Sequence, residues 1–259
     1  MRVIERDKIW RWLLKIAVVP IFVCVTEAEE IICRVASSPP VIDGKLDDKC
    51  WKDSVKVTGF ILDFADDIEM GQFQGNHKDL HGRVAPDDKQ TVVYITYDSK
   101  NLYLGFECKE LHPERLKANA QGRDDRVWLD DCVEIFLDIE CSQKTYYQII
   151  INSKGEIFDH FVKEVKKGKK KGTISLDANV RWDGDIEVET SINKEEWIAE
   201  VRISLESLNL KIEQGKSIGV NFTREQYTLE EEPKGLFTTF ANISGHFQQP
   251  DKFGRLTFK

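Results

Sequence analysis

The segment that decides the fold lies at residues 127–138 and reads Val-Trp-Leu-Asp-Asp-Cys-Val-Glu-Ile-Phe-Leu-Asp. Side chains of a β-strand point alternately to its two faces, and the sequence from Cys132 to Asp138 alternates in this way. One face is wholly apolar, whereas the second face carries Glu134. We therefore predict a strand with one well-buried face and a second face whose carboxylate follows closely on the aromatic ring of Trp128.

The same two-residue period runs through most of the chain, and helical patterns are scarce. Besides residues 132–139, the segments expected as strands are 91–97, 102–107, 145–152, 156–162, 185–192, 197–204, 218–226, 236–241 and 254–258. About ten strands joined by short polar turns predict an all-β fold, a two-sheet antiparallel β-sandwich of the immunoglobulin or jelly-roll type. The lysine-rich residues 163–172 are expected to form a solvated hairpin tip. Trp51 is expected to anchor the core at the sandwich edge.

The N-terminal residues have the composition of a secretory signal peptide. Residues 1–15 are basic, residues 16–25 are apolar apart from Pro20, and small residues follow at Thr26 and Ala28. The apolar run is about half of the ~20 residues that span a bilayer, which favours cleavage near Ala28 over an uncleaved anchor. We therefore expect a signal peptide at residues 1–28, a single domain at residues 29–259, and a secreted, periplasmic or extracellular protein without membrane contact after cleavage.

Charge and cysteine content exclude several classes of function. The whole chain has a formal net charge of −8, and removal of residues 1–28 takes away five basic and three acidic residues, which leaves about −10. Such a surface repels nucleic acid and anionic lipid. The five cysteines that remain form no Cys-x-x-Cys pair, so a zinc site is not indicated. The sequence leaves open whether one or two disulfides form after export.

Trp128 and Glu134 together suit a sugar ligand. The C–H face of a sugar ring packs on an aromatic ring, and its hydroxyl groups donate hydrogen bonds to a carboxylate. Catalysis is not indicated, because glycoside hydrolysis needs two acids about 5–9.5 Å apart. Asp130 would lie roughly 13 Å from Glu134 along one extended strand. Serine-hydrolase, zinc-protease and phosphate-loop motifs are also missing from the sequence. We therefore expect a binding protein and not an enzyme.

Seven segments, in order along the chain, resemble the carbohydrate-binding module family 9 domains, which belong to a wider group of DOMON-like β-sandwiches. The segments are 40–51 (PVIDGKLDDKCW), 97–104 (YDSKNLYL), 128–138 (WLDDCVEIFLD), 146–155 (YYQIIINSKG), 197–204 (WIAEVRIS), 219–224 (GVNFTR) and 250–258 (PDKFGRLTF). They are spread in order over nearly the whole mature chain. Their order and spacing are specific for the fold and less specific for the ligand, because function depends on the site.

The resemblance implies a sandwich that grips one end of a sugar chain between two aromatic rings. Trp128 matches the first aromatic position, and Glu134 matches the glutamate that binds the sugar hydroxyls. The second aromatic position, usually tryptophan, holds Phe247, which offers a smaller ring and no N–H donor. The family's arginine on the next strand is missing, and Tyr147 or Gln148 stands near its place. The amide of Gln148 is suited to bond a hydroxyl. The expected carbohydrate-binding residues are therefore Trp128, Glu134, Gln148 and Phe247.

The resemblance also implies structural calcium. Calcium takes several oxygen ligands, which acidic loops supply. Glu110 and Asp131 best match the positions at which the family places metal-binding acids, and they are the expected ligands. No organic cofactor is expected. The expected partner is an oligosaccharide or polysaccharide, and association with glycoside hydrolases on another chain is a further expectation.

Two alternatives to sugar binding stay open. Some DOMON-like sandwiches hold haem and carry electrons. Haem needs axial ligands, commonly methionine or histidine, and Met70, His160 and His246 are the candidates. The other alternative is a β-sandwich scaffold that kept the fold and lost its ligand, which Phe247 and the missing arginine would favour.

Overall fold

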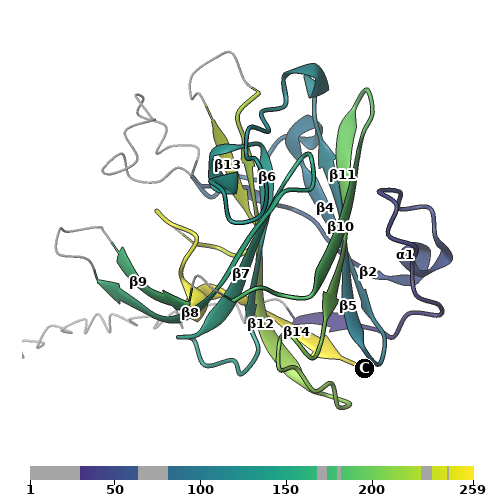
Figure 1. Ribbon diagram of the computed structural model, residues 1–259, viewed down its shortest axis with the longest axis vertical. Helices are drawn as coiled ribbons and strands as arrows, with labels where there is room; N and C mark the ends of the chain where they lie inside the picture. Colours follow the sequence, from purple (N-terminus) through teal and green to yellow (C-terminus); the bar gives the residue numbers. More distant parts are fainter. Residues whose placement is uncertain (1–29, 64–80, 168–173, 180–181, 229–234, 244) are drawn as a thin grey trace, which may run out of the picture.

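The computed structural model describes residues 30–63, 81–167, 174–179, 182–228, 235–243 and 245–259. The expected signal peptide at residues 1–28 therefore lies outside the described residues, as does Met70. The described chain forms two β-sheets that face one another, and Figure 1 shows them nearly edge-on. This arrangement confirms the predicted all-β sandwich. Within the described residues, no helix has the length and apolar character needed to cross a membrane.

The larger sheet has nine strands. They are β1 (Glu30–Cys33), β3 (Ile61–Leu62), β6 (Cys132–Asp138), β7 (Tyr146–Asn152), β8 (Ile157–Lys167), β9 (Ile174–Asn179), β12 (Ser217–Gln226), β13 (Leu236–Thr239) and β14 (Gly254–Phe258). The main path runs β1-β14-β12-β6-β7-β8-β9, with β13 paired to β12 and β3 paired to β13. Only the β1–β14 pair is parallel among these strands. The antiparallel sheet expected from the short turns is thus confirmed.

The smaller sheet has five strands, and the helical pieces are short. The strands are β2 (Val55–Val57), β4 (Thr91–Tyr97), β5 (Asn101–Lys109), β10 (Ile186–Ile192) and β11 (Glu196–Ser204), in the order β10-β11-β5-β4-β2. The helical pieces are α1 (Lys49–Asp53), η1 (Asp87–Lys89), η2 (Pro113–Arg115), η3 (Val127–Leu129) and η4 (Pro250–Lys252). Short helical turns of this kind shape the loops at the sandwich surface and do not form a layer of their own.

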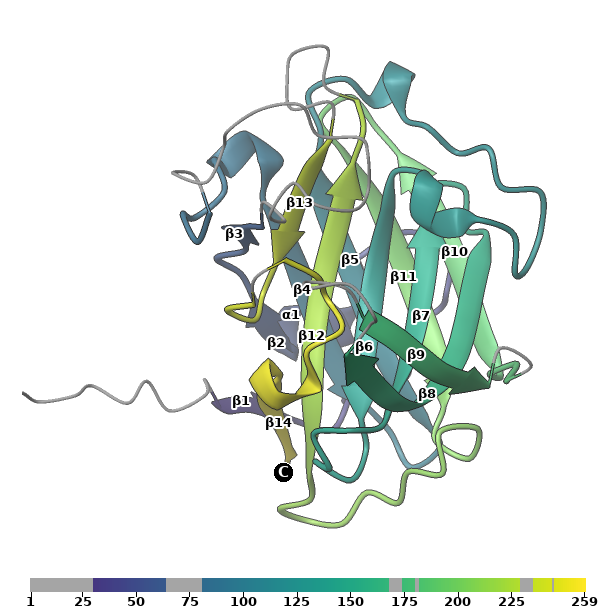
Figure 2. The ribbon, with the colours of Figure 1, turned by 90° about the vertical axis from the view of Figure 1, so that its left-hand side faces the viewer.

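The core lies between the two sheets, where the predicted apolar faces meet. Val133, Ile135 and Leu137 of β6 are fully buried in one cluster with residues of the opposite sheet, such as Leu104 and Val201. The outer face of β6 is buried as well. Apolar side chains from residues 120–128, 241–243 and 245–253 pack on this face, and Figure 2 shows the turn η3 in front of the sheet. The site residues therefore lie beneath surface segments and not on a bare sheet.

Three local features complete the comparison with the sequence. β8 extends to Lys167 and pairs with β9, so residues 163–167 of the expected hairpin tip form paired strand, whereas residues 168–172 lie outside the described residues. The five cysteines in the described residues are all free thiols, and the disulfides left open by the sequence do not form among them. Trp51 is 1% exposed and packs with Ile42 and Leu46, which confirms its predicted role as a core anchor.

Candidate functional site

Glu134 and Gln148, two of the predicted site residues, lie next to each other on the outer face of the nine-stranded sheet. β6 and β7 are antiparallel neighbours, and Gln148 Nε2 donates a hydrogen bond of 2.6 Å to Glu134 Oε2. Gln148 Oε1 lies 2.9 Å from Nε2 of His160 on β8. Tyr147 faces the core instead and packs on Phe161, with 4.8 Å between ring centroids. The strand period therefore places Gln148, and not Tyr147, beside Glu134.

A second carboxyl group, Glu225 of β12, completes this polar row and was not predicted. It shares a side-chain hydrogen bond with Glu134, and its Oε2 accepts a hydrogen bond of 2.7 Å from Tyr227 Oη. Burial raises the pKa of Glu134 to about 7, against the opposing effect of its hydrogen bonds. Burial and then the charge of Glu134 raise the pKa of Glu225 well above its usual range. Alternation along β12 is the only sequence signal that pointed to this residue.

Trp128 lies beside this row, on the short helical turn η3. Its side chain is half-buried, and its ring meets the ring of Phe158 edge-on, with 5.0 Å between centroids and 77° between planes. Phe158 also contacts His160, at 5.1 Å between centroids. Tyr227 Oη, whose hydrogen is donated to Glu225, lies 3.4 Å from the carbonyl oxygen of Trp128. The structure thus connects Trp128 to both ends of the row through Phe158 and Tyr227, with the ring kept partly open to solvent.

Phe247 lies in an aromatic cluster on the same outer face. It is 8% exposed and packs with Phe237 at 6.2 Å between centroids, in a cluster that includes Phe136 and Phe253. Phe136 follows Glu134 by two residues on the same face of β6, so this cluster adjoins the polar row. The packing is that of a buried core side chain, and a stacking role for Phe247 stays a prediction.

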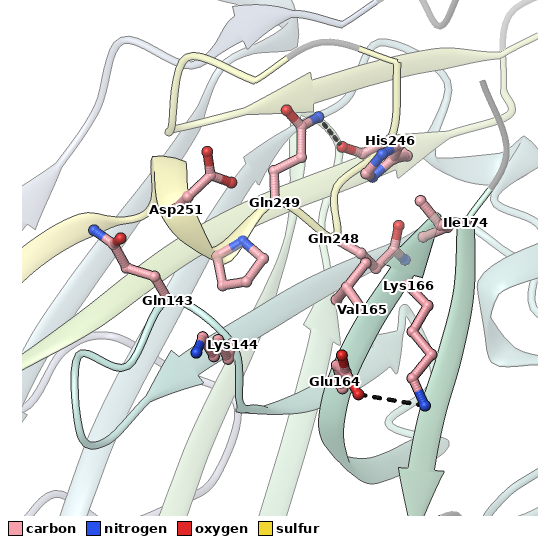
Figure 3. A pocket seen from close by; sticks show the side chains of 11 residues that line it. Gln143, Lys144, Glu164, Val165, Lys166, Ile174, His246, Gln248, Gln249 and Asp251 are labelled. Carbon is pink, nitrogen blue, oxygen red and sulfur yellow. Dashed lines mark hydrogen bonds and ion pairs between the residues drawn. The ribbon is translucent and has the colours of Figure 1, made fainter. Parts of the chain in front are cut away.

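A groove of about 430 Å³ lies beside the aromatic cluster (Figure 3). His246 and Gln248 line the groove, whereas Phe247 between them turns into the cluster. The opposite wall comes from β8 and β9, where Glu164 and Lys166 form an ion pair of 3.3 Å. Polar residues and apolar ones such as Val165 and Ile174 both line the groove, which lies outside the row that holds Glu134.

Several buried polar atoms in the row have no hydrogen-bond partner. They are Tyr146 Oη, His160 Nδ1, Asn221 Nδ2 and Thr223 Oγ1. The register places all four residues on the same outer face as Glu134. A buried polar group without a partner costs about 1–3 kcal/mol, and native structures contain few of them. Their concentration beside two carboxyl groups fits a place where hydroxyl groups of a ligand or of water complete the hydrogen bonding.

The expected calcium ligands are buried, but their oxygens are already bonded to the protein. Glu110 Oε2 accepts hydrogen bonds from Gln226 Nε2 at 2.7 Å and from Arg224 Nη2 at 3.2 Å. Asp131 accepts backbone N–H bonds of 2.7 and 2.8 Å, one to each oxygen, from Lys117 and Tyr227. Calcium needs six to eight oxygen ligands. A guanidinium cation in contact with Glu110 does not fit such a site.

We expect that calcium does not bind at Glu110 and Asp131 and therefore does not change the thermal stability of the domain. The reason is that Arg224 already supplies the positive charge that Glu110 needs. The measurement is the midpoint of thermal unfolding with calcium chloride and with a chelator, for the natural chain and for Glu110→Gln. A midpoint that rises with calcium in the natural chain but not in Glu110→Gln would contradict this expectation.

One acidic group in the described residues has the spacing of a metal site. Asp124, Asp159 and Asp183 each place a carboxylate oxygen within 4.8 Å of the others. The buried Asp159, however, accepts hydrogen bonds of 2.9 and 2.8 Å from Nε and Nη2 of Arg123. The cation that balances this group is therefore part of the protein.

The fold and the site together are those of a β-sandwich domain that carries a carboxyl–amide row beneath an aromatic side chain. A family model described as "Carbohydrate family 9 binding domain-like" matches residues 42–259. The chain therefore belongs to this family, as its sequence resemblance indicated. No curated protein is similar enough in sequence to count as a match.

Three solved structures share the fold. A putative carbohydrate-binding protein from Bacteroides uniformis aligns with a TM-score of 0.61 and 19% identity, over 90% of this chain and 100% of that chain. A family 9 carbohydrate-binding module from Caldicellulosiruptor kristjanssonii in complex with cellotriose aligns with a TM-score of 0.53 and 16% identity, over 89% and 94%. Its complex with glucose aligns with a TM-score of 0.55 and 18% identity, over 88% and 95%. At these identities the likeness establishes the fold alone.

Proposed function

We propose that the chain is a secreted, non-catalytic carbohydrate-binding protein that holds a sugar unit against Trp128. Glu134 accepts hydrogen bonds from the hydroxyl groups, and Gln148 positions that carboxylate. The observation that carries the proposal is the buried row of Glu134, Gln148 and Glu225 with four unpartnered polar atoms around it. Membership of family 9 supports it, as do the cellotriose and glucose complexes of structural relatives.

Glycoside hydrolases also use two carboxyl groups, but the geometry of the pair in this protein argues against hydrolysis. The two acids of a hydrolase stand about 5–9.5 Å apart, with the scissile bond between them. Glu134 and Glu225 are hydrogen-bonded to each other, which leaves no room for a glycosidic bond between the two groups. His160, which was weighed as a haem ligand, bonds Gln148 through Nε2 and belongs to the same row. Binding without reaction is the chemistry that this arrangement favours.

We expect Trp128→Ala to weaken sugar binding at least about tenfold, because a sugar ring loses its stacking surface. The measurement is titration calorimetry with glucose and cello-oligosaccharides as probes. Trp182→Ala is the matched control, since Trp182 is also half-buried but packs on Tyr147 at the core side. Far-UV circular dichroism checks that both variants are folded.

Two results would argue against the proposal. The first is the lack of any heat signal with the natural chain across neutral hexoses and their oligomers. The second is an affinity that Trp128→Ala and Trp182→Ala change equally.

The proposed location is outside the cytoplasm, and a glycoside hydrolase on a separate chain is the proposed partner. The location follows from the basic and apolar pattern of residues 1–28. Mass spectrometry of protein recovered from the medium or periplasm is expected to give an N-terminus close to residue 29. An intact Met1 on exported protein would contradict cleavage.

A further inference from the structure

The proposed sugar site contains two carboxyl groups in direct contact, although a simple sugar site needs only one. β12 and β6 are antiparallel, with Thr223 opposite Glu134 and Glu225 opposite Cys132. Glu225 lies two residues beyond Thr223 on β12 and therefore points to the same outer face as Glu134. Their side chains meet in a hydrogen bond. Two ionised carboxylates offer only acceptors, so this contact requires a proton on one of them.

Neighbouring donors bind one oxygen of each carboxyl group, so the shared proton lies between the other two oxygens. Tyr227 Oη donates to Glu225 Oε2 over 2.7 Å, and Gln148 Nε2 donates to Glu134 Oε2 over 2.6 Å. Each carboxyl group thus has one oxygen held by a neighbouring hydroxyl or amide. Both residues are at most 4% exposed, so bulk water screens their interaction poorly. Two charges this close in a buried site would repel strongly, which favours the singly protonated pair.

Among the described residues, the basic groups near the pair are His160 and Lys117. Burial lowers the pKa of His160 to about 4, so its ring is neutral at ordinary pH. The cation that acts on Glu225 is Lys117, whose Nζ lies 4.9 Å from the centroid of the Tyr227 ring. The titratable and charged groups that face the pair from the elements packed on it are Lys117, Asp130, Asp131, Cys132, Tyr146, His160 and Tyr227. Counted over the described residues, the groups around the pair therefore leave the site with a net negative charge, in contrast to a site that pairs its glutamate with an arginine.

We propose that Glu225 is the second carboxyl group of the sugar site, that it shares one proton with Glu134, and that the site consequently accepts neutral saccharides and rejects acidic ones. The ligand class rests on the proposed function; the shared proton does not. A neutral hexose brings hydroxyl donors to an anion that accepts them. A uronic acid brings a second carboxylate next to a buried negative charge, where repulsion and desolvation both oppose binding.

The shared proton is tested without any sugar, by infrared difference spectroscopy of the natural chain and Glu225→Gln. At neutral pH the natural chain is expected to show the C=O stretch of a protonated carboxyl group, and Glu225→Gln is expected to shift this band, because the proton then lies on the buried Glu134 alone. Glu189→Gln, on an exposed position of β10, is the matched control and is expected to keep the band. A natural chain without the band would overturn the proposal.

The ligand class is tested by calorimetry with glucose and glucuronate, which differ only in a carboxylate. Glucuronate is expected to bind the natural chain at least about tenfold more weakly than glucose. Glucose affinity is expected to change over the pH range in which the pair loses its proton, and Glu225→Gln is expected to move this pH range. Equal affinities for the two sugars, or the same pH profile in both proteins, would overturn the proposal.

The two experiments separate this inference from the proposed function. A chain that shows the infrared band but binds no sugar contradicts sugar binding and supports the shared proton. A chain that binds glucose through Trp128 but lacks the band supports sugar binding and overturns the shared proton.

Discussion

Glu200→Ala is expected to lower the free energy of unfolding by about 3–5 kcal/mol. Glu200 Oε2 accepts hydrogen bonds of 2.8, 2.9 and 3.1 Å from the backbone N–H groups of Asp43, Gly44 and Lys45. Its Oε1 accepts one of 2.7 Å from Nε1 of the buried Trp51. Alanine would leave four donors without their acceptor. The loop around residues 43–45 and the helix α1 would then lose their attachment to β11.

Chemical denaturation with urea, followed by tryptophan fluorescence, measures this loss. Glu189→Ala is the matched control, because Glu189 lies directly opposite Glu200 on β10 but is exposed. The control is expected to change stability by less than about 0.5 kcal/mol. Similar losses in the two variants would mean that the acceptor role of Glu200 is unimportant. Far-UV circular dichroism of each variant confirms that the starting state is folded.

Arg224→Met is expected to cost a similar amount, about 3–5 kcal/mol, because it leaves a buried carboxylate without its cation. Arg224 is 1% exposed, and its Nη2 lies 3.2 Å from Oε2 of Glu110, which is also fully buried. Arg224 Nη1 donates a hydrogen bond of 2.7 Å to the carbonyl oxygen of Lys109. The pair joins β12 of one sheet to the end of β5 in the other, so its loss weakens the link between the sheets.

A double variant identifies the source of this cost. The double variant Arg224→Met, Glu110→Gln is expected to recover part of the lost stability, because it no longer contains the uncompensated anion of Glu110. Arg255→Ala, at an exposed position of β14, is the control for loss of an arginine. A double variant less stable than Arg224→Met alone would show that the charge of Glu110 is not what the arginine balances.

The pH dependence of stability follows from the raised pKa of Glu134. A carboxyl group whose pKa is higher in the folded state contributes stability below its unfolded pKa, and this stability is lost as the pH rises. For Glu134 the loss is expected between about pH 4.5 and about pH 7. Burial raises the pKa of Asp131 to about 6, so its contribution to the stability of the fold is also lost as the pH rises, over a lower pH range. Urea unfolding across this range is expected to be flatter for Glu134→Gln than for the natural chain.

The strand pattern was sufficient to predict the sandwich and part of the site. The alternation at Cys132–Asp138 predicted both the core face of β6 and the outward position of Glu134, and the structure has both. The spacing of Trp51 from Ile42 and Leu46 predicted an anchor at the sandwich edge, which is confirmed. These features depend on neighbouring residues in one segment, where the geometry of the backbone imposes the pattern.

Other elements were harder to predict because their stability comes from pairing. β1, β2 and β3 are two to four residues long and have too few positions to show a period. β9 alternates between half-buried and exposed residues and is held at the sheet edge by β8. Phe247 was predicted as a sugar platform from the family resemblance, and this role stays a prediction. Its burial comes from a cluster whose members lie in several distant segments.

By itself, the sequence determined the all-β class, the family and the outward direction of Glu134, because a period of two follows from the local geometry of an extended chain. Only the tertiary structure decided that Glu225 meets Glu134 and that Arg224 meets Glu110. The register between strands separated by about ninety residues joins the first pair, and the packing of one sheet on the other joins the second. Neither depends on local geometry, so no pattern within a single segment specifies them.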